Sequence, residues 1–215
     1  MKRLLKQYGV LFTAMLLTTA CGKEDYVYPD LVTEMVCLKT DANGIGTAFI
    51  TDEGNIWHLQ EGNRPNKLTA DSTYRVVGRY APINETEAKA YSFYSTISSL
   101  PKPKSEYKTI HTDPVTIQSI WKSNDYLNSV LQVMVKDQKH NLSFIDHGIT
   151  TNADGTQTLT LTLYHDRGND VEGFNEKVYL SIPLWHYAEK LNKGDTILFQ
   201  LNTYKEGMTS RTFIY

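Results

Sequence analysis

The sequence has little cysteine, little proline and no excess of charge of one sign. Two cysteines in 215 residues are too few for a disulfide framework or a cysteine zinc cluster. The 22 basic residues are balanced by 24 acidic ones, which leaves no basic footprint for nucleic acid. Seven prolines and 40% hydrophobic residues exclude collagen and intrinsic disorder. These exclusions leave a folded chain of one large or two small domains.

The N-terminus has the organisation of a secretory signal peptide. Three basic residues stand among the first six, and the apolar run Val10–Leu17 follows them. That run is much shorter than the roughly 20 residues of a membrane-spanning helix. The small residues Thr18, Thr19 and Ala20 complete the pattern, so residues 1–20 are predicted to be a leader.

Cys21 stands directly after the leader, and residues 17–21 resemble a bacterial lipoprotein signal. The resemblance implies that Cys21 carries acyl chains such as palmitate and begins the mature protein, with residues 21–32 as a tether. Several acyl chains give a permanent anchor, whereas one chain binds membranes only marginally. The alternatives are that Cys21 is a free thiol or that it pairs with Cys37.

The acidic stretch Lys23-Glu24-Asp25 resembles a surface-export signal of Bacteroidetes-type lipoproteins. That resemblance implies a protein anchored in the outer membrane and displayed on the cell surface. The alternative is a solvated polar tether that carries no export signal. Without the three basic residues of the leader, 19 basic and 24 acidic residues remain, so the mature chain has a net charge of −5.

Residues 33–100 are predicted to form a small five-stranded, OB-like β-barrel. Short β-branched and aromatic stretches recur there, separated by turn residues and without a convincing helical period. The expected strands are Thr33–Thr40, Gly46–Thr51, Asn55–Leu59, Ser72–Tyr80 and Ala90–Ile97. Pro101 and Pro103 then interrupt the pattern, and residues 101–107 are predicted to be a linker that cannot lie inside a sheet.

Residues 108–215 are predicted to form a seven-stranded β-sandwich. Leu159, Leu161 and Leu163 alternate with threonines, which predicts a strand with one buried face. The expected strands are Val115–Trp121, Tyr126–Lys136, Asn141–Asp146, Thr156–His165, Glu176–Ile182, Asp195–Thr203 and Ser210–Tyr215. Leu184–Leu191 is the one segment predicted to be helical. The fold class is therefore all-β.

This arrangement resembles the NigD-like lipoproteins of Bacteroidetes, which join an OB-like barrel to a C-terminal β-sandwich. The matching features are Cys21 with its acidic tether, the five strands ending at Tyr91–Ile97, Tyr126-Leu127-Asn128, the strand from Asp154 to His165, and Gly194-Asp195-Thr196-Ile197. None of them is a catalytic motif. The family name implies at most a bacteriocin-immunity or envelope role, and the resemblance supplies no site residues.

No catalytic, cofactor or metal site is predicted. The chain has no Gly-x-Ser-x-Gly elbow, and Cys37 lies among apolar residues as a small core side chain. Neither His140 and His147 nor His165 has a partner at the spacing that directs two histidines at one ion. The loop 166–173 is rich in potential calcium ligands, but it lacks the regular EF-hand order, and its turn-forming residues alone explain it.

Two surfaces are candidates for binding. One is the barrel face with Arg75 and Arg79, because OB folds bind oligomers on one sheet face. The other is the ring cluster Trp185, His186 and Tyr187, although the favoured interpretation of Trp185 is a plug at one end of the sandwich. Asp71-Ser72-Thr73 and Asp195-Thr196-Ile197 also resemble a loose Bacteroidetes O-glycosylation motif.

The sequence therefore predicts a lipid-anchored protein that binds a protein or glycan partner, or supports the envelope, without catalysis. The alternatives are a bacteriocin-immunity protein and an enzyme that acts on glycans with unrecognised carboxylates. No nucleic acid and no cofactor is expected.

Overall fold

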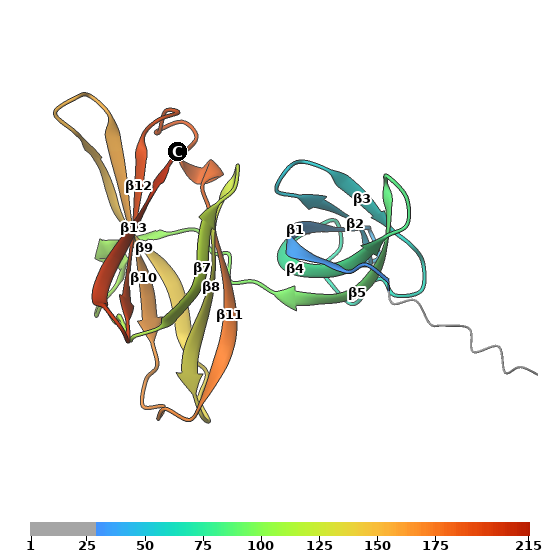
Figure 1. Cartoon of the computed structure of the whole chain (residues 1–215), viewed down its shortest axis with the longest axis horizontal. Helices are drawn as coiled ribbons and strands as arrows, with labels where there is room; N and C mark the ends of the chain where they lie inside the picture. The colour runs from blue at the N-terminus through green and yellow to red at the C-terminus, as the bar shows by residue number, and fades with distance from the viewer. Residues whose placement is uncertain (1–28) are drawn as a thin grey trace, which may run out of the picture.

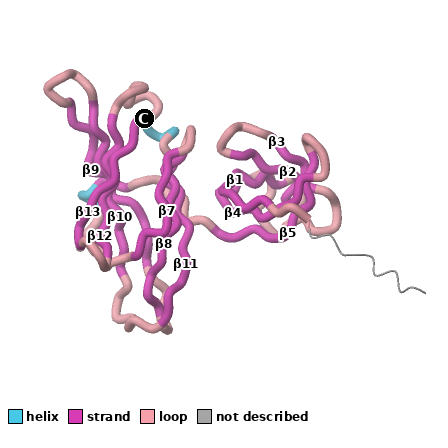
Figure 2. Tube along the Cα trace, viewed as in Figure 1, coloured by secondary structure: helices cyan, strands magenta, loops and turns pink. Residues whose placement is uncertain are grey.

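The computed structural model describes residues 29–215. The predicted leader, Cys21 and the tether as far as residue 28 lie outside the described residues. Figure 1 shows two β-rich bodies side by side, joined by one connection that leaves β5 and enters the sandwich. Figure 2 shows that strands and loops make up nearly all of both bodies. Among residues 29–215 the structure has no helix with the length and hydrophobicity that crossing a bilayer requires.

The N-terminal body is a closed five-stranded barrel, as the sequence predicts. Its strands follow the order β1-β2-β3-β5-β4, and β3 and β5 pair in parallel while the other pairs are antiparallel. The strands are β1 (Val32–Thr40), β2 (Gly46–Thr51), β3 (Ile56–Leu59), β4 (Thr73–Pro82) and β5 (Glu87–Ser95). Closure leaves no free sheet edge in this body.

Alternating residues of the barrel strands fill its interior. Val36, Leu38 and Val76 are buried there with Phe49, whose ring lies 4.6 Å from the ring of Tyr80. Because the side-chain period of a strand is two, the residues between them point out of the barrel. The outward face of the β1–β4 pair is the one that meets the sandwich.

The C-terminal body is a β-sandwich of two sheets. A five-stranded sheet has the order β13-β12-β10-β9-β6 and a three-stranded sheet the order β11-β8-β7. The strands are β6 (Lys102–Pro103), β7 (Thr116–Lys122), β8 (Tyr126–Val135), β9 (Asn141–Thr151), β10 (Gln157–Asp166), β11 (Phe174–Pro183), β12 (Thr196–Thr203) and β13 (Gly207–Ile214). The seven predicted strands are all present, and β9 continues five residues past its predicted end.

The sandwich core follows the predicted alternation. Leu159, Leu161 and Leu163 of β10 are buried, as are Ile197 and Phe199 of β12, which pairs with β10 in parallel. Burying such side chains stabilises a fold by about 1.5–3 kcal/mol each. These residues belong to one continuous core that both sheets share.

Two local expectations are wrong. Pro103 lies in β6, a two-residue strand that pairs with β9, so the expected linker contributes to a sheet. This is tolerated because β6 is an edge strand, where a missing N–H leaves no ladder bond unmade. The predicted helix Leu184–Leu191 is only a single 3₁₀ turn, η2 (Trp185–Tyr187). Its apolar spacing reflects Tyr187 and Leu191, which are buried in the sandwich core.

Candidate functional site

The barrel meets the sandwich through the outward face of β1 and β4. Cys37 lies opposite Arg75 in this antiparallel pair, and Met35 lies opposite Val77. All four side chains alternate with core residues of the barrel and therefore face away from its interior. The partner surface is the outer face of the three-stranded sheet, which carries Asn128.

Arg75 is the centre of this contact. Its guanidinium binds both carboxylate oxygens of Asp52, with Nη1–Oδ1 at 2.6 Å and Nη2–Oδ2 at 2.9 Å. It also donates across the interface to Ser181 Oγ at 2.9 Å and to Asn128 Oδ1 at 3.2 Å. The Tyr126 ring covers it, 3.9 Å from the guanidinium carbon. A bidentate pair with these additional donors fixes position and angle together.

The groups around Arg75 also bind one another. Asn128 donates from Nδ2 to Asp52 Oδ2 at 3.1 Å and accepts from Ser181 Oγ at 2.7 Å. Asn128 and Ser181 are fully buried. Burial by itself would lower the pKa of Arg75, but the hydrogen bonds and charges of Asp52 and Cys37 together outweigh burial and raise that pKa. A satisfied network of this kind holds the barrel and the sandwich in one orientation.

The expected binding face of the barrel is therefore corrected. Arg75 is buried in the contact between the two bodies and offers no free surface, whereas Arg79 on the same strand is exposed. Cys37 is half-buried beside Arg75 and Tyr126 rather than inside the barrel core. Burial and the bond to Cys37 raise the pKa of Tyr126 to about 12. The two-residue side-chain period of a strand places Cys37 and Arg75 on the outward face of the barrel. Whether that face is exposed or buried depends on the docked sandwich.

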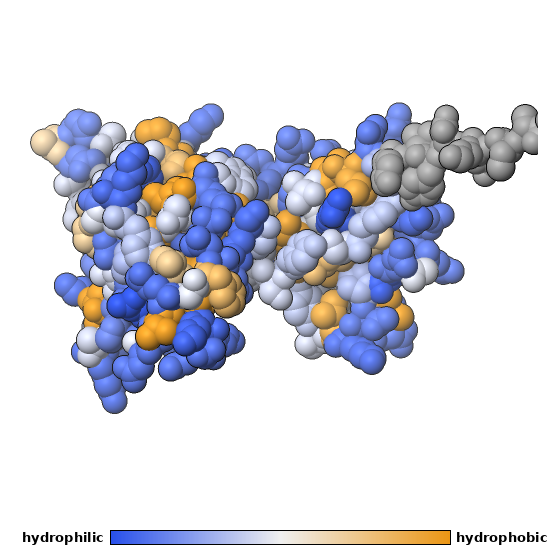
Figure 3. All heavy atoms as spheres, turned by 60° about the horizontal axis from the view of Figure 1, so that its bottom comes forward, coloured by the Kyte–Doolittle hydropathy of each residue, from blue (hydrophilic) through white to orange (hydrophobic). Residues whose placement is uncertain are grey.

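A cleft of about 660 Å³ opens beside this contact, between the barrel and the three-stranded sheet. Figure 3 shows the two bodies meeting at a waist that is narrower than either of them. The barrel contributes Thr33, Glu34, Met35, Asp52, Glu53 and Val77, and the sandwich contributes Gln118, Ser119, Trp121, Ser123, Asn124, Val130, Lys177 and Tyr179. Its volume lies in the usual range for small-ligand sites.

The cleft combines an apolar floor with polar walls. Met35 and Val77 are buried, whereas Trp121 keeps 37% of its surface exposed. Glu34 accepts a hydrogen bond from the Tyr80 hydroxyl, and burial together with this bond raises the pKa of Tyr80. Sequence reasoning missed Glu34 and Trp121 as site residues. No local motif marks them, because they lie 87 positions apart and come to line one cleft only when the two bodies dock.

In the structure, the three residues of the predicted ring cluster, Trp185, His186 and Tyr187, do not share one surface. Trp185 is 52% exposed and therefore does not plug the sandwich. Tyr187 is buried instead, and its hydroxyl donates to Asp146 Oδ2 at 2.9 Å. His186 is exposed between them. Of the predicted ring cluster, only Trp185 and His186 are available to a partner.

The two loose glycosylation matches differ in their surroundings. Asp195 is buried and accepts backbone N–H bonds from Gln157 and Asn192, so it positions the start of β12. Asp71 has a left-handed φ of 48° in the turn before β4, and the neighbouring Thr73 is exposed.

The C-terminal body also matches a known family. The sequence model of the family described as the NigD-like C-terminal beta sandwich domain matches residues 98–215, which are more than half of the chain. The chain belongs to the NigD-like family. Among curated proteins, no sequence matches it.

Solved structures resemble nearly all of this NigD-like chain. A NigD-like immunity protein from Bacteroides caccae is 28% identical, with a TM-score of 0.69 over 88% of this chain and 99% of that one. A protein described as toxin-related from Parabacteroides distasonis is 16% identical, with a TM-score of 0.68 over 86% and 93%. A candidate lipoprotein from Bacteroides fragilis is 12% identical, with a TM-score of 0.56 over 87% and 97%. The last two likenesses concern the fold alone.

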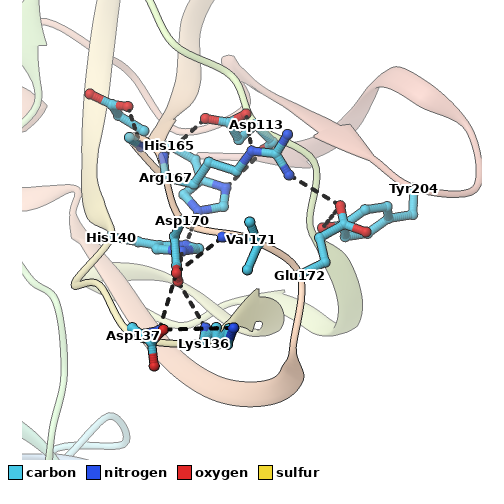
Figure 4. Close-up of polar contacts among 12 residues, drawn as sticks. Asp113, Lys136, Asp137, His140, His165, Arg167, Asp170, Val171, Glu172 and Tyr204 are labelled. Carbon is cyan, nitrogen blue, oxygen red and sulfur yellow. Dashed lines mark hydrogen bonds and ion pairs between the residues drawn. The ribbon is translucent and has the colours of Figure 1, made fainter.

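The NigD-like sandwich also holds a buried polar chain, which Figure 4 shows. Asp170 accepts backbone N–H bonds from Lys136 at 2.8 Å and Asp137 at 3.1 Å. Its Oδ2 lies 3.2 Å from His140 Nε2, and His140 Nδ1 lies 2.9 Å from His165 Nε2. The side chains of Asp170, His140 and His165 are almost completely buried. Asp170 therefore ties the loop after β10 to the turn after β8.

The other histidine of the sequence prediction lies elsewhere. His147 Nε2 contacts Thr162 Oγ1 at 2.9 Å, outside the chain of His140 and His165. In the loop after β10, Asp166 accepts the N–H of Gly168 at 2.8 Å, and Asp170 is engaged as described. The bond of Asp166 is typical of turns, in which a short acidic side chain accepts a backbone N–H two residues ahead.

Replacing Arg75 tests the domain contact. In Arg75→Met, Asp52 keeps its charge and its bond from Asn128 but loses its cationic partner, so the free energy of unfolding falls by about 3–5 kcal/mol. The double variant Arg75→Met, Asp52→Leu removes both charges and recovers most of that loss. Urea unfolding measures both variants. Equal stability of Arg75→Met and wild type would contradict a structural role for the pair.

Acid unfolding tests Asp170. Backbone N–H bonds, led by that of Lys136, lower the pKa of Asp170 from 3.8 to about 2. The unfolded chain takes up this proton first, so stability that is present above pH 4 is lost as the pH falls toward 2. Asp170→Asn should flatten the stability profile in this window, whereas Asp137→Asn, an exposed carboxylate in the same turn, should leave it unchanged. Matching slopes for Asp170→Asn and wild type would refute the assignment.

Proposed function

We propose that this chain is a lipid-anchored protein of the outer membrane that binds a ligand at the cell surface without transforming it. The leader and Cys21 support the anchor, and Lys23-Glu24-Asp25 supports surface display. A structural neighbour described as a candidate lipoprotein of Bacteroides fragilis is consistent with this address. The ligand site is the cleft between barrel and sandwich.

The cleft is the observation that carries the proposal. It is large enough for a small ligand, and the Arg75 network beside it fixes its two walls relative to each other. Preformed walls favour binding because little conformational entropy is lost when the ligand enters. Residues from both bodies line the cleft, so a ligand would contact the barrel and the sandwich at once.

The lining is best suited to a saccharide. Hydroxyl, amide and carboxylate groups from Thr33, Gln118, Asn124 and Glu53 offer both donors and acceptors, which sugar hydroxyls require. The exposed indole of Trp121 provides a flat apolar surface on which the C–H face of a sugar ring stacks.

Binding without catalysis is favoured over glycan hydrolysis. Of the three carboxylates that line the cleft, that of Asp52 is bound at both oxygens by Arg75. That of Glu34 accepts the Tyr80 hydroxyl. The bond pattern thus commits two of the three groups to structural contacts, whereas acid–base hydrolysis needs a pair of free carboxyl groups.

The similar immunity protein favours a second candidate. At 28% identity over 99% of its length, the Bacteroides caccae protein suggests a protective role in which the cleft receives a segment of a foreign protein. In that case the same walls would bind a polypeptide.

Trp121 distinguishes these possibilities. The purified full-length protein in detergent should bind members of a glycan array, and Trp121→Ala should reduce that binding at least tenfold because stacking is lost. Trp185→Ala is the matched control, since this exposed tryptophan does not line the cleft. Shortened glycans after incubation with the protein would show that it hydrolyses them and would contradict binding without catalysis. Trp121-dependent capture of a protein, with no glycan bound, would favour the immunity-type role.

The anchor is tested separately. Cys21→Ala should abolish incorporation of labelled palmitate, because no acceptor thiol remains at the end of the leader. Cys37→Ala is the control and should keep the label. Protease treatment of intact cells should remove the wild-type protein from the surface. Label retained by Cys21→Ala, or full protection from protease, would contradict the corresponding part of the proposal.

A further inference from the structure

The segment before β7 runs beside the end of β10. Thr112 forms a parallel bridge with His165, fixed by Asp113 N–H to His165 O at 2.9 Å and His165 N–H to His111 O at 3.0 Å. In extended chains the residues on either side of a bridge point to the opposite face. His111 and Asp113 therefore share a face with Asp166, which follows His165.

These three side chains bring a nitrogen and two carboxylates together. One ligand atom from each lies within 4.8 Å of the others, and His111 Nδ1 is 3.8 Å from Asp166 Oδ1. Two ligands of one ion at about 2.1 Å each are separated by at most about 4.2 Å, so small side-chain rotations complete the site. The side chains are 42%, 24% and 28% exposed for His111, Asp113 and Asp166, which leaves room for an ion to enter.

The backbone holds both carboxylates in place. Asp113 Oδ2 accepts the N–H of Arg167 at 3.0 Å, and Asp166 Oδ1 accepts the N–H of Gly168 at 2.8 Å. Behind them, His165 Nδ1 contacts the carbonyl oxygen of Asp113 at 2.9 Å. Ligands that are oriented in advance bind a metal more tightly.

Arg167 is the charge that competes for this site, and it has a second partner. Its Nε lies 3.3 Å from Asp113 Oδ1, and its Nη1 lies 3.2 Å from Glu172 Oε1. Figure 4 shows the guanidinium between the two carboxylates. Asp113, Asp166 and Glu172 carry three negative charges against one positive charge. Arg167 can therefore remain with Glu172 while a divalent cation takes Asp113.

We propose that His111, Asp113 and Asp166 bind a divalent transition-metal ion of the zinc class. One imidazole and two carboxylates are typical Zn²⁺ ligands, whereas Ca²⁺ prefers oxygen alone. Three protein ligands leave at least one position for water or a ligand. A sequence search for paired histidines does not find this site, because its ligands come from two segments far apart in the chain and include one histidine.

Isothermal titration of the tag-free full-length protein with ZnCl₂, after EDTA treatment, tests the proposal. One ion should bind per chain, and CaCl₂ should bind at least tenfold more weakly. His111→Gln should reduce zinc affinity at least about tenfold, since a ligand matters at least as much as its supporting groups. His186→Gln, at an exposed histidine elsewhere, should change nothing. Equal affinity of His111→Gln and wild type would overturn the site.

Variants of Arg167 and Glu172 separate the proposal from misfolding, because one of them is expected to bind zinc more tightly than the wild type. Arg167→Gln keeps the backbone N–H that positions Asp113 and removes the competing charge, so zinc affinity should rise about two- to fivefold. Glu172→Gln removes the second partner of Arg167, so affinity should fall by a similar factor. Unchanged or weaker zinc binding in a folded Arg167→Gln variant would contradict the proposed ligand set.

Discussion

The buried guanidinium of Arg75 determines how the two halves of this molecule fit together. Each of its three nitrogens contacts a partner, and these partners come from both the barrel and the sandwich. A buried charge without partners costs several kcal/mol, so other docked arrangements of the two bodies are disfavoured. The cleft beside the contact depends on this constraint, because neither body forms it alone.

The family match covers only one side of the cleft. The NigD-like domain spans residues 98–215 and includes the sandwich residues that line the cleft, whereas Glu34 and Glu53 of the barrel line it from outside the matched range. The Bacteroides caccae immunity protein resembles 88% of this chain and so spans both bodies.

Strand positions follow from the sequence where one face of a strand is buried and the other is not. Leu159, Leu161 and Leu163 show this alternation, and the structure buries all three. The helix predicted at Leu184–Leu191 is wrong because the spacing of its apolar residues also suits a turn that covers the end of a sandwich. The charge of Arg75 on the outward face of β4 carries no local signal of burial. Arg75 therefore resembles a surface residue until the second body is placed.

The sequence by itself determined the all-β class, the five strands of the barrel, the seven main strands of the sandwich and the resemblance to the NigD-like family. These depend on local period, turn residues and short motifs, which neighbouring residues encode. Only the tertiary structure decided that Arg75 is buried, that Trp121 and Glu34 line one cleft, and that His111 and Asp113 lie beside Asp166. These groups come from segments far apart in the chain. Their proximity depends on strand order and domain docking, which the local pattern of a single sequence does not specify.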